Sequence, residues 1–372
     1  MLSCAPSGLD DARARPIFPR SGRRPRMGEP ADHVQTRLLA IVAALGVLFA
    51  LRETYAVTMP LAAAAVVIAA IWPAKPWLHR FLPEAASNLG AALLLLAALA
   101  AFAGAVSFAL AQVVQAFARQ SDRLEQLYRQ AAAWVESWGG TIGGAGGYSR
   151  LMDMGQQALS NAYTLIVYLG FVALLVIFGL PEASALRDKV GGAFGREGAR
   201  EVVAAADETA GKIRQYIWVT TLTSLITGVA SLLWSWLVGL DLALVWGLLN
   251  FLLNYIPVVG NFIGIVPPAL YALLQFGGWT IPLVVFAGFS VIQIAVSNFV
   301  APTLQGRSLA LSPMAVLLAL SIWSWVWGLA GALIAVPLTS ALVVICRRIP
   351  RLNWVAALVS SGDASTGKEE AA

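Results

Sequence analysis

The chain has 372 residues and a formal net charge of +5, and 59% of its residues are hydrophobic while only 12% are charged. Soluble domains contain about 25% charged residues, so this composition excludes an ordinary soluble globule and indicates a surface that faces lipid. The basic residues flank apolar stretches, so we expect no nucleic-acid partner. Cys4 and Cys346 predict neither a disulfide framework nor a thiolate metal site, and we expect no metal and no cofactor.

Several long apolar stretches without Lys, Arg, Asp or Glu follow one another along the chain. A helix of about 20 apolar residues spans a bilayer. The strands of a membrane barrel would instead alternate apolar and polar residues with period two, and the sequence lacks this pattern. The sequence therefore predicts an all-α polytopic membrane protein with about eight membrane segments, some of them broken or re-entrant in the C-terminal half.

The N-terminal half alternates apolar and charged segments. Residues 1–37 contain seven arginines among Pro, Gly and Ser, which predicts a disordered cytoplasmic tail with Met27 as an alternative start. From Gln112 to Trp138, apolar residues recur at helical spacing between charged ones, which indicates an amphipathic helix outside the membrane core. Because cytoplasmic loops are rich in Lys and Arg, we expect both termini in the cytoplasm.

The pattern changes after Asp241, where prolines and glycines interrupt the apolar runs. Broken helices inside a bilayer are tolerated only where protein or water satisfies the freed backbone groups, and in transporters such breaks line the substrate site. The run from Ser312 to Cys346 is too long for one ordinary span and predicts either one tilted helix or a helical hairpin.

The expected segments are, in chain order, a disordered basic cytoplasmic tail (1–37), N-terminal membrane helices (38–111), an extracytoplasmic amphipathic helical segment (112–160), a membrane helix (161–180), a cytoplasmic helical segment (181–214), a C-terminal membrane core with Pro/Gly-broken helices (215–346) and a cytoplasmic tail (347–372).

Only two charged side chains, Asp241 and Arg307, occur between Gln215 and Cys346. A charge near the bilayer centre costs several kcal/mol, about 3 on insertion scales, so each lies at an interface or has a function. Asp241 is either a helix-cap or loop residue or a carboxylate that couples ions. Arg307 is either an interfacial anchor or a contact for substrate or lipid headgroups.

Five amide side chains lie in or beside the apolar segments, where an unpaired polar group is costly. All five can form interhelical hydrogen bonds. Alternatively, Asn254, Asn261 and Asn298, which lie near the Pro/Gly breaks, present donors and acceptors to a small polar solute. Trp323, Trp325 and Trp327 form either an interfacial aromatic belt or a ligand platform. The amides are Asn250, Asn254, Asn261, Gln293 and Asn298.

The sequence contains none of the common catalytic patterns. It has no Gly-x-Ser-x-Gly elbow, no His-Glu-x-x-His and no Walker motif. The glycine-rich stretch 139–147 lacks the Lys-Ser/Thr ending of a phosphate loop. We therefore expect that the chain is not an enzyme and that any active transport uses an ion gradient or a partner.

Two segments of the C-terminal half contain Asn, Pro and Gly in a specific order and spacing. The first runs from Asn254-Tyr-Ile-Pro-Val-Val-Gly260 through Gly264-Ile-Val-Pro-Pro268. The second contains Asn298-Phe-Val-Ala-Pro302, then Gly306-Arg-Ser-Leu-Ala-Leu-Ser-Pro313, and ends with Gly331-Ala-Leu-Ile-Ala-Val-Pro337. In this order and spacing, the two segments resemble the signature of the autoinducer-2 exporter family, also called PerM-type permeases.

This resemblance implies a multi-pass transporter of the bacterial inner membrane, with autoinducer-2 export or sodium(lithium)/proton antiport in different members and a possible homo-oligomer. Many members have an acidic residue before the asparagine that matches Asn298, whereas this chain has Ser297. Because antiport normally needs an intramembrane carboxylate, we rank export of a small polar solute first, antiport through Asp241 second, and a non-transporting membrane scaffold third.

The expected partners are a small-molecule or ion substrate and the lipid bilayer. Asp241 is the candidate for ion coupling. The candidates for the substrate pathway all lie at or beside the helix breaks, and they are Asn254, Pro257, Gly260, Asn261, Gly264, Pro267, Asn298, Pro302, Gly306 and Arg307.

Overall fold

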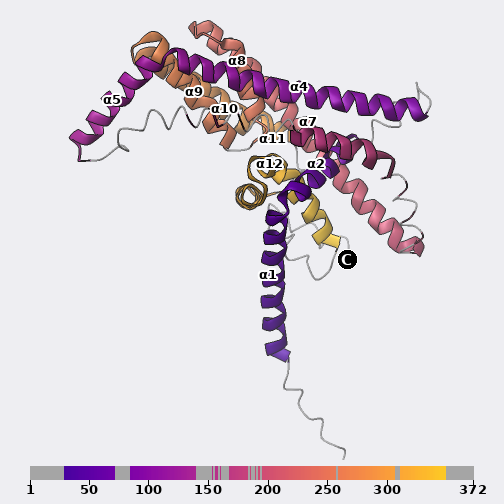
Figure 1. Cartoon of the computed structure of the whole chain (residues 1–372). Coiled ribbons are helices and arrows are strands. Elements are labelled where there is room, and N and C mark those ends of the chain that lie inside the picture. Colours follow the sequence, from indigo (N-terminus) through magenta and orange to yellow (C-terminus); the bar gives the residue numbers. More distant parts are fainter. Residues whose placement is uncertain are drawn as a thin grey trace, which may run out of the picture. The chain divides into compact units, whose positions relative to one another are not determined.

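A computed structural model describes residues 29–71, 84–139, 167–182, 195–256, 259–305 and 311–348, with a few isolated positions between 153 and 192 (Figure 1). Every regular element in these ranges is a helix. Large apolar side chains along them point outward, and Trp218, Trp236 and Leu237 are each 69% exposed. A surface of this kind suits lipid rather than water, which confirms the predicted all-α membrane class.

Four of the described helices are long and apolar enough to cross a membrane, or up to five if the bent pair Ile41–Glu53 and Tyr55–Ile71 counts as one span. Shorter apolar helices cover Val167–Glu182, Ala243–Leu253 and Gly260–Phe276. The labelled helices are α1 (Glu29–Glu53), α2 (Tyr55–Ile71), α4 (Glu84–Arg119), α5 (Ser121–Ser137), α7 (Gly195–Val238), α8 (Ala243–Leu253), α9 (Val259–Phe276), α10 (Thr280–Ala295), the π-helix η1 (Val296–Val300), α11 (Ala301–Gln305) and α12 (Pro313–Arg348).

The described residues divide after Ala50 into two units, and the contacts given for the helices all lie within the second unit. Two helices of this unit run past the predicted segment boundaries. Helix α4 continues through position 112 to Arg119 before α5 begins, and α7 joins the end of the predicted cytoplasmic segment to the following span without a break. The glycine-rich stretch 140–147 lies outside the described residues.

Helix α7 packs against α2, α8, α10 and α12, and its contact with α8 is the most extensive of these. A Cβ on Gly228 would lie 2.9 Å from the Phe251 Cβ and 3.0 Å from the Gly247 carbonyl oxygen. A Cβ on Gly247 would lie 2.8 Å from the Gly228 carbonyl oxygen. Small residues allow the backbones of membrane helices to approach closely, so the two facing glycines determine the distance between α7 and α8.

Helix α12 is a hairpin of two helices rather than one straight helix. Its backbone is non-helical at Trp327 (φ −127°) and Gly328 (φ 61°), where only glycine adopts the positive φ readily. The Trp323 indole Nε1 donates to Thr339 Oγ1 at 3.0 Å, although 16 residues of straight helix would separate them by about 24 Å. The structure thus selects the hairpin from the two predicted alternatives.

Two of the three tryptophans in this hairpin are buried, at 7% and 8% exposure, and do not form the interfacial belt that was one of their two interpretations. The rings of Trp323 and Trp327 stack with centroids 5.0 Å apart, and the Trp327 Nε1 donates to Thr58 Oγ1 of α2 at 3.1 Å. The third ring, of Trp325, lies 4.4 Å from the guanidinium carbon of Arg52. The buried pair therefore holds the hairpin together and joins it to α2.

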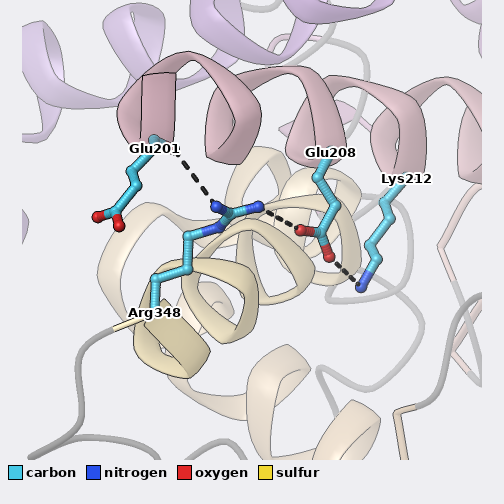
Figure 2. A network of polar contacts seen from close by, with 4 residues as sticks. All are labelled: Glu201, Glu208, Lys212 and Arg348. Atoms are coloured by element: carbon cyan, nitrogen blue, oxygen red, sulfur yellow. Dashed lines mark hydrogen bonds and ion pairs between the residues drawn. The ribbon is translucent and has the colours of Figure 1, made fainter. Parts of the chain in front are cut away.

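The charged N-terminal part of α7, before its apolar stretch, is joined to the end of α12 by an ion network (Figure 2). The Glu208 carboxylate lies 3.0 Å from an Arg348 nitrogen and 3.4 Å from the Lys212 Nζ. Arg348 also donates to the Glu201 backbone carbonyl at 3.4 Å. Burial raises the pKa of Glu208, but Arg348 and Lys212 outweigh this effect and hold the pKa below its ordinary value.

Candidate functional site

Helices α8, α9 and α10 pack side by side around a shared apolar core. Trp246 and Phe289 are fully buried in this core, and Tyr271 packs on Trp246 with ring centroids 5.6 Å apart. Buried aromatic rings contribute a large apolar area with few rotatable bonds. This core gives the polar side chains of the same three helices fixed positions.

A buried polar cluster joins the three helices at Asn250 of α8, Gly264 of α9 and Gln293 of α10. The Asn250 Nδ2 donates to the carbonyl oxygens of Trp246, at 3.0 Å, and of Gly264, at 3.1 Å. The Gln293 Nε2 donates to the Asn250 Oδ1 at 3.0 Å. Asn250 is fully buried and Gln293 is 4% exposed, so each of these bonds avoids the high cost of an unpaired polar group in an apolar medium.

The prolines of α9 explain why Asn250 bonds to Gly264. Pro268 has no backbone N–H, so the Gly264 carbonyl four residues earlier lacks its usual helical donor. The Asn250 amide replaces that donor. Glycine is also required at this point for space, because a Cβ on Gly264 would overlap the Asn250 Oδ1 and lie 3.2 Å from the Gln293 Nε2.

A pocket of about 400 Å³ lies between α9, α10 and η1 and is called the α9–α10 pocket below. Its polar lining includes two of the predicted pathway residues, Asn261 and Asn298. The Asn261 Nδ2 donates to the Ser297 Oγ at 3.1 Å, and the Asn298 Nδ2 donates to the Ile294 carbonyl at 3.0 Å. The lining residues are Asn261, Phe262, Ile265, Val266, Phe286, Ser290, Gln293, Ile294, Ser297 and Asn298.

The π-helix η1 lies at the edge of this pocket and contains Ser297 and Asn298. A π-turn inside an α-helix is rare and occurs often at functional sites. Beyond it, Pro302 of α11 has no N–H for the Asn298 carbonyl. The pocket is therefore bordered by irregular backbone on the η1 side and by the proline-containing helix α9 on the other.

The amide orientation of Gln293 follows from its neighbours. Because the Asn250 Nδ2 already donates to two carbonyl oxygens, the Asn250 Oδ1 must be the atom that faces Gln293. An oxygen acceptor requires a donor opposite it, so Gln293 presents Nε2 to Asn250. The Gln293 Oε1 is buried and has no hydrogen-bond donor among the described residues.

The other predicted asparagine, Asn254, lies outside the α9–α10 pocket. It is half-buried at the end of α8, and its Nδ2 donates to Ser224 Oγ of α7 at 3.1 Å. The neighbouring Tyr255 hydroxyl donates to the Thr221 Oγ1 of α7 at 3.0 Å. Asn254 thus makes the interhelical bond that was one of its two interpretations.

Asp241 lies in the exposed turn between α7 and α8. Its backbone N–H donates to the Gln275 Oε1 at 2.9 Å, and its carbonyl accepts from the Trp246 Nε1 at 2.9 Å. The Gln275 Nε2 also donates to the Gly239 carbonyl at 3.0 Å. These three bonds fix the backbone of the turn, and the exposed position matches the loop interpretation of Asp241.

The remaining pathway candidates lie at several places. Gly260 packs at the start of α9, where its N–H donates to the Ile256 carbonyl at 2.9 Å. Pro267 is half-buried inside α9, and Pro302 is exposed in α11. Pro257, Gly306 and Arg307 lie outside the described residues.

Three of the polar pocket residues were not among the substrate-pathway candidates, although their spacing is visible in the sequence. Ser290, Gln293 and Ser297 recur at intervals of three and four residues, which places them on one face of a helix. The walls Phe262 and Phe286 carry no comparable signal, because single aromatic residues are common in membrane helices. In the described part of the chain, no three His, Cys, Asp or Glu side chains lie close enough to hold a metal ion.

The apolar helices, the broken C-terminal segments and the helical hairpin define a multi-pass α-helical membrane protein. Residues 38–351 match the profile of the AI-2E family transporter. The chain therefore belongs to the AI-2E transporter family, as the two sequence motifs indicated.

Individual relatives match about half of the chain. The chain is 34% identical over 206 residues to the AI-2 transport protein TqsA of Escherichia coli (strain K12), and the aligned region covers 54% of this chain and 57% of that protein. A putative transport protein of Haemophilus influenzae is 32% identical over 215 residues, with coverage of 57% and 61%. A sodium-lithium/proton antiporter of Halobacillus andaensis is 27% identical over 171 residues, with coverage of 45% and 47%.

Proposed function

We propose that this protein transports a small uncharged solute across the bacterial inner membrane and that the solute binds in the α9–α10 pocket. The observation that carries the proposal is the pocket itself, in which a few amide and hydroxyl side chains lie among apolar walls around a space of about 400 Å³ beside a π-turn. Pockets of this size accommodate small molecules. Membership of a transporter family supports moving the ligand rather than converting it.

The proposed orientation places both termini in the cytoplasm. It is supported by the arginines of residues 1–37 and by Arg347, Arg348 and Arg351 near the other end, because cytoplasmic segments are enriched in Lys and Arg.

The uncharged class of solute is favoured over cation/proton exchange. The described residues that line the pocket include no Asp, Glu, Lys or Arg. Asp241, the one acidic side chain between Gln215 and Cys346, lies in an exposed turn. An antiporter normally needs a carboxylate inside the membrane to exchange its ions. We therefore do not assign to this chain the ion exchange for which the Halobacillus andaensis relative is named.

Efflux from proteoliposomes tests the proposal. The solutes are small and uncharged, beginning with AI-2, for which the E. coli relative is named. Replacing Asn261 or Asn298 by Ala removes one pocket amide, and we expect roughly fivefold slower efflux from each change because one hydrogen bond contributes about 1 kcal/mol.

The control is Asp241→Asn, which we expect to leave efflux and any cation-dependent pH change in the liposomes unaffected. Size-exclusion profiles confirm that each variant is folded. Efflux no faster than from protein-free liposomes for every solute, or equal rates in wild type and both asparagine variants, would refute the proposal. A cation-driven pH change that disappears in Asp241→Asn would establish antiport instead.

A further inference from the structure

The Gln293 side chain carries a hydrogen-bonding capacity that the described protein does not use. Its Nε2 is held by Asn250 at 3.0 Å, while its buried Oε1 has no donor among the described residues. Most buried polar atoms in native proteins have a partner, and an exception calls for an explanation. Gln293 also lines the α9–α10 pocket, which makes a ligand bound there a candidate for the missing donor.

The other lining residues limit what kind of ligand carries that donor. Phe262, Ile265, Val266, Phe286 and Ile294 form most of the wall, so the body of the ligand is apolar. None of the described lining residues is charged, and an unpaired ion in such surroundings is strongly disfavoured. An oxygen acceptor selects a hydroxyl or N–H group.

We propose that the α9–α10 pocket binds an uncharged amphiphile, with one hydroxyl or amide N–H on the Gln293 Oε1 and an apolar body between Phe262 and Phe286. This inference rests on the proposed transport function and narrows its solute class from small uncharged molecules to amphiphiles. A polyol such as ribitol fits the pocket poorly, because most of its hydroxyls would meet apolar walls and lose their bonds to water.

Binding to the full chain in lipid nanodiscs tests the inference without a transport assay. The probes are 4-(4-fluorophenyl)-1-butanol and its methyl ether, which lacks the donor, and binding is followed by fluorine NMR after subtraction of the signal from empty nanodiscs. We expect the alcohol to bind about fivefold more tightly than the ether, the ratio for one neutral hydrogen bond. Ribitol is expected not to displace the alcohol.

Substitutions at two neighbouring positions on α10 distinguish binding in the pocket from binding elsewhere on the helix surface. Ser290 lines the pocket, whereas Val291 is 65% exposed and does not. Ser290→Trp fills the pocket and is expected to abolish saturable binding of both probes. Val291→Trp adds the same ring outside the pocket and is expected to leave both dissociation constants unchanged.

A second pair of variants tests the Gln293 acceptor. Gln293→Met removes Oε1 and is expected to make the alcohol bind no better than the ether. Asn250→Ala breaks the same Gln293–Asn250 hydrogen bond but keeps Oε1, so the preference for the alcohol is expected to persist. If Gln293→Met fails to fold, the ether comparison and the tryptophan pair still decide the question.

Equal binding of alcohol and ether to the wild type would overturn the inference and would indicate that the pocket takes lipid chains. Undiminished binding by Ser290→Trp, or displacement of the alcohol by ribitol, would also overturn it. If the probes do not bind but solute efflux is intact, the amphiphile inference is wrong and the transport proposal is unaffected. If the probes bind as expected but no solute is transported, the transport proposal is wrong and the binding inference is unaffected.

Discussion

The α7–α8 pair and the α9–α10 pair both carry polar side chains within an apolar segment, but they use them differently. Between α7 and α8, facing glycines bring the backbones together, and Asn254 bonds to Ser224. Between α9 and α10, the amides and hydroxyls border a pocket walled by Phe262 and Phe286. Polar residues therefore serve helix packing where small residues close the contact, and on our proposal they are available to a ligand where space remains.

We expect Gly264→Ala, which disrupts the polar cluster beside the pocket, to cause the greatest loss of stability. The new methyl group would overlap the Asn250 Oδ1. Overpacking and the loss of buried hydrogen bonds together are expected to lower the free energy of unfolding by about 3 kcal/mol. Thermal unfolding in detergent measures the change.

Gly278→Ala is the matched control, because its Cβ would meet nothing within 4 Å. We expect its midpoint of unfolding to stay close to that of the wild type. Equal midpoints for Gly264→Ala and Gly278→Ala would mean that the cluster tolerates a side chain at position 264, and the described link between α8 and α9 would be wrong.

A smaller effect is expected from Gly247→Ala, which tests the close packing between α7 and α8. Its Cβ would lie 2.7 Å from the Leu232 Cβ and 2.8 Å from the Gly228 carbonyl oxygen. We expect a loss of about 2 kcal/mol in unfolding free energy. Gly104→Ala, with open space around its Cβ, is expected to cause no such loss.

Probe binding sharpens the result for Gly247→Ala. If α7–α8 serves packing, folded Gly247→Ala protein should still bind the fluorinated alcohol in nanodiscs. Loss of binding at unchanged stability would show that this pair contributes to the ligand site after all.

The smallest expected effect is that of Glu208→Gln, in the ion network at the charged part of α7 (Figure 2). The Glu208 side chain is 40% exposed, so solvent screens the network and its loss is expected to cost only about 0.5 kcal/mol. Because the pKa of the folded state is lowered, the carboxylate stabilises the protein above its ordinary pKa. This contribution is lost as the pH falls through the lowered pKa.

Melting temperatures at neutral and acidic pH measure this contribution. The drop on acidification should be smaller in Glu208→Gln than in the wild type. Glu201→Gln is the control, since Arg348 donates to the backbone carbonyl of Glu201, which this change keeps, and its melting temperature at neutral pH should match the wild type. A larger drop in Glu208→Gln than in the wild type would contradict the assigned direction of the pKa shift.

The asparagines show how far prediction from the sequence reached. Their position near proline and glycine breaks indicated polar groups that need partners, and Asn261 and Asn298 do lie together at one pocket. Asn254 has the same sequence context but contacts α7 instead. Helical periodicity identifies residues that share a face, yet it does not identify the helix that the face meets.

The helical membrane class and the interrupted C-terminal half were predictable because apolar length and proline breaks act through local chemistry, and two sequence motifs indicated the family. The choice of a hairpin for α12, the burial of Trp323 and Trp327, and the bond between Gln293 and Asn250 across 43 residues became known only from the three-dimensional packing. These features depend on the packing of distant segments, and a periodic pattern within one helix does not specify the partner across the contact.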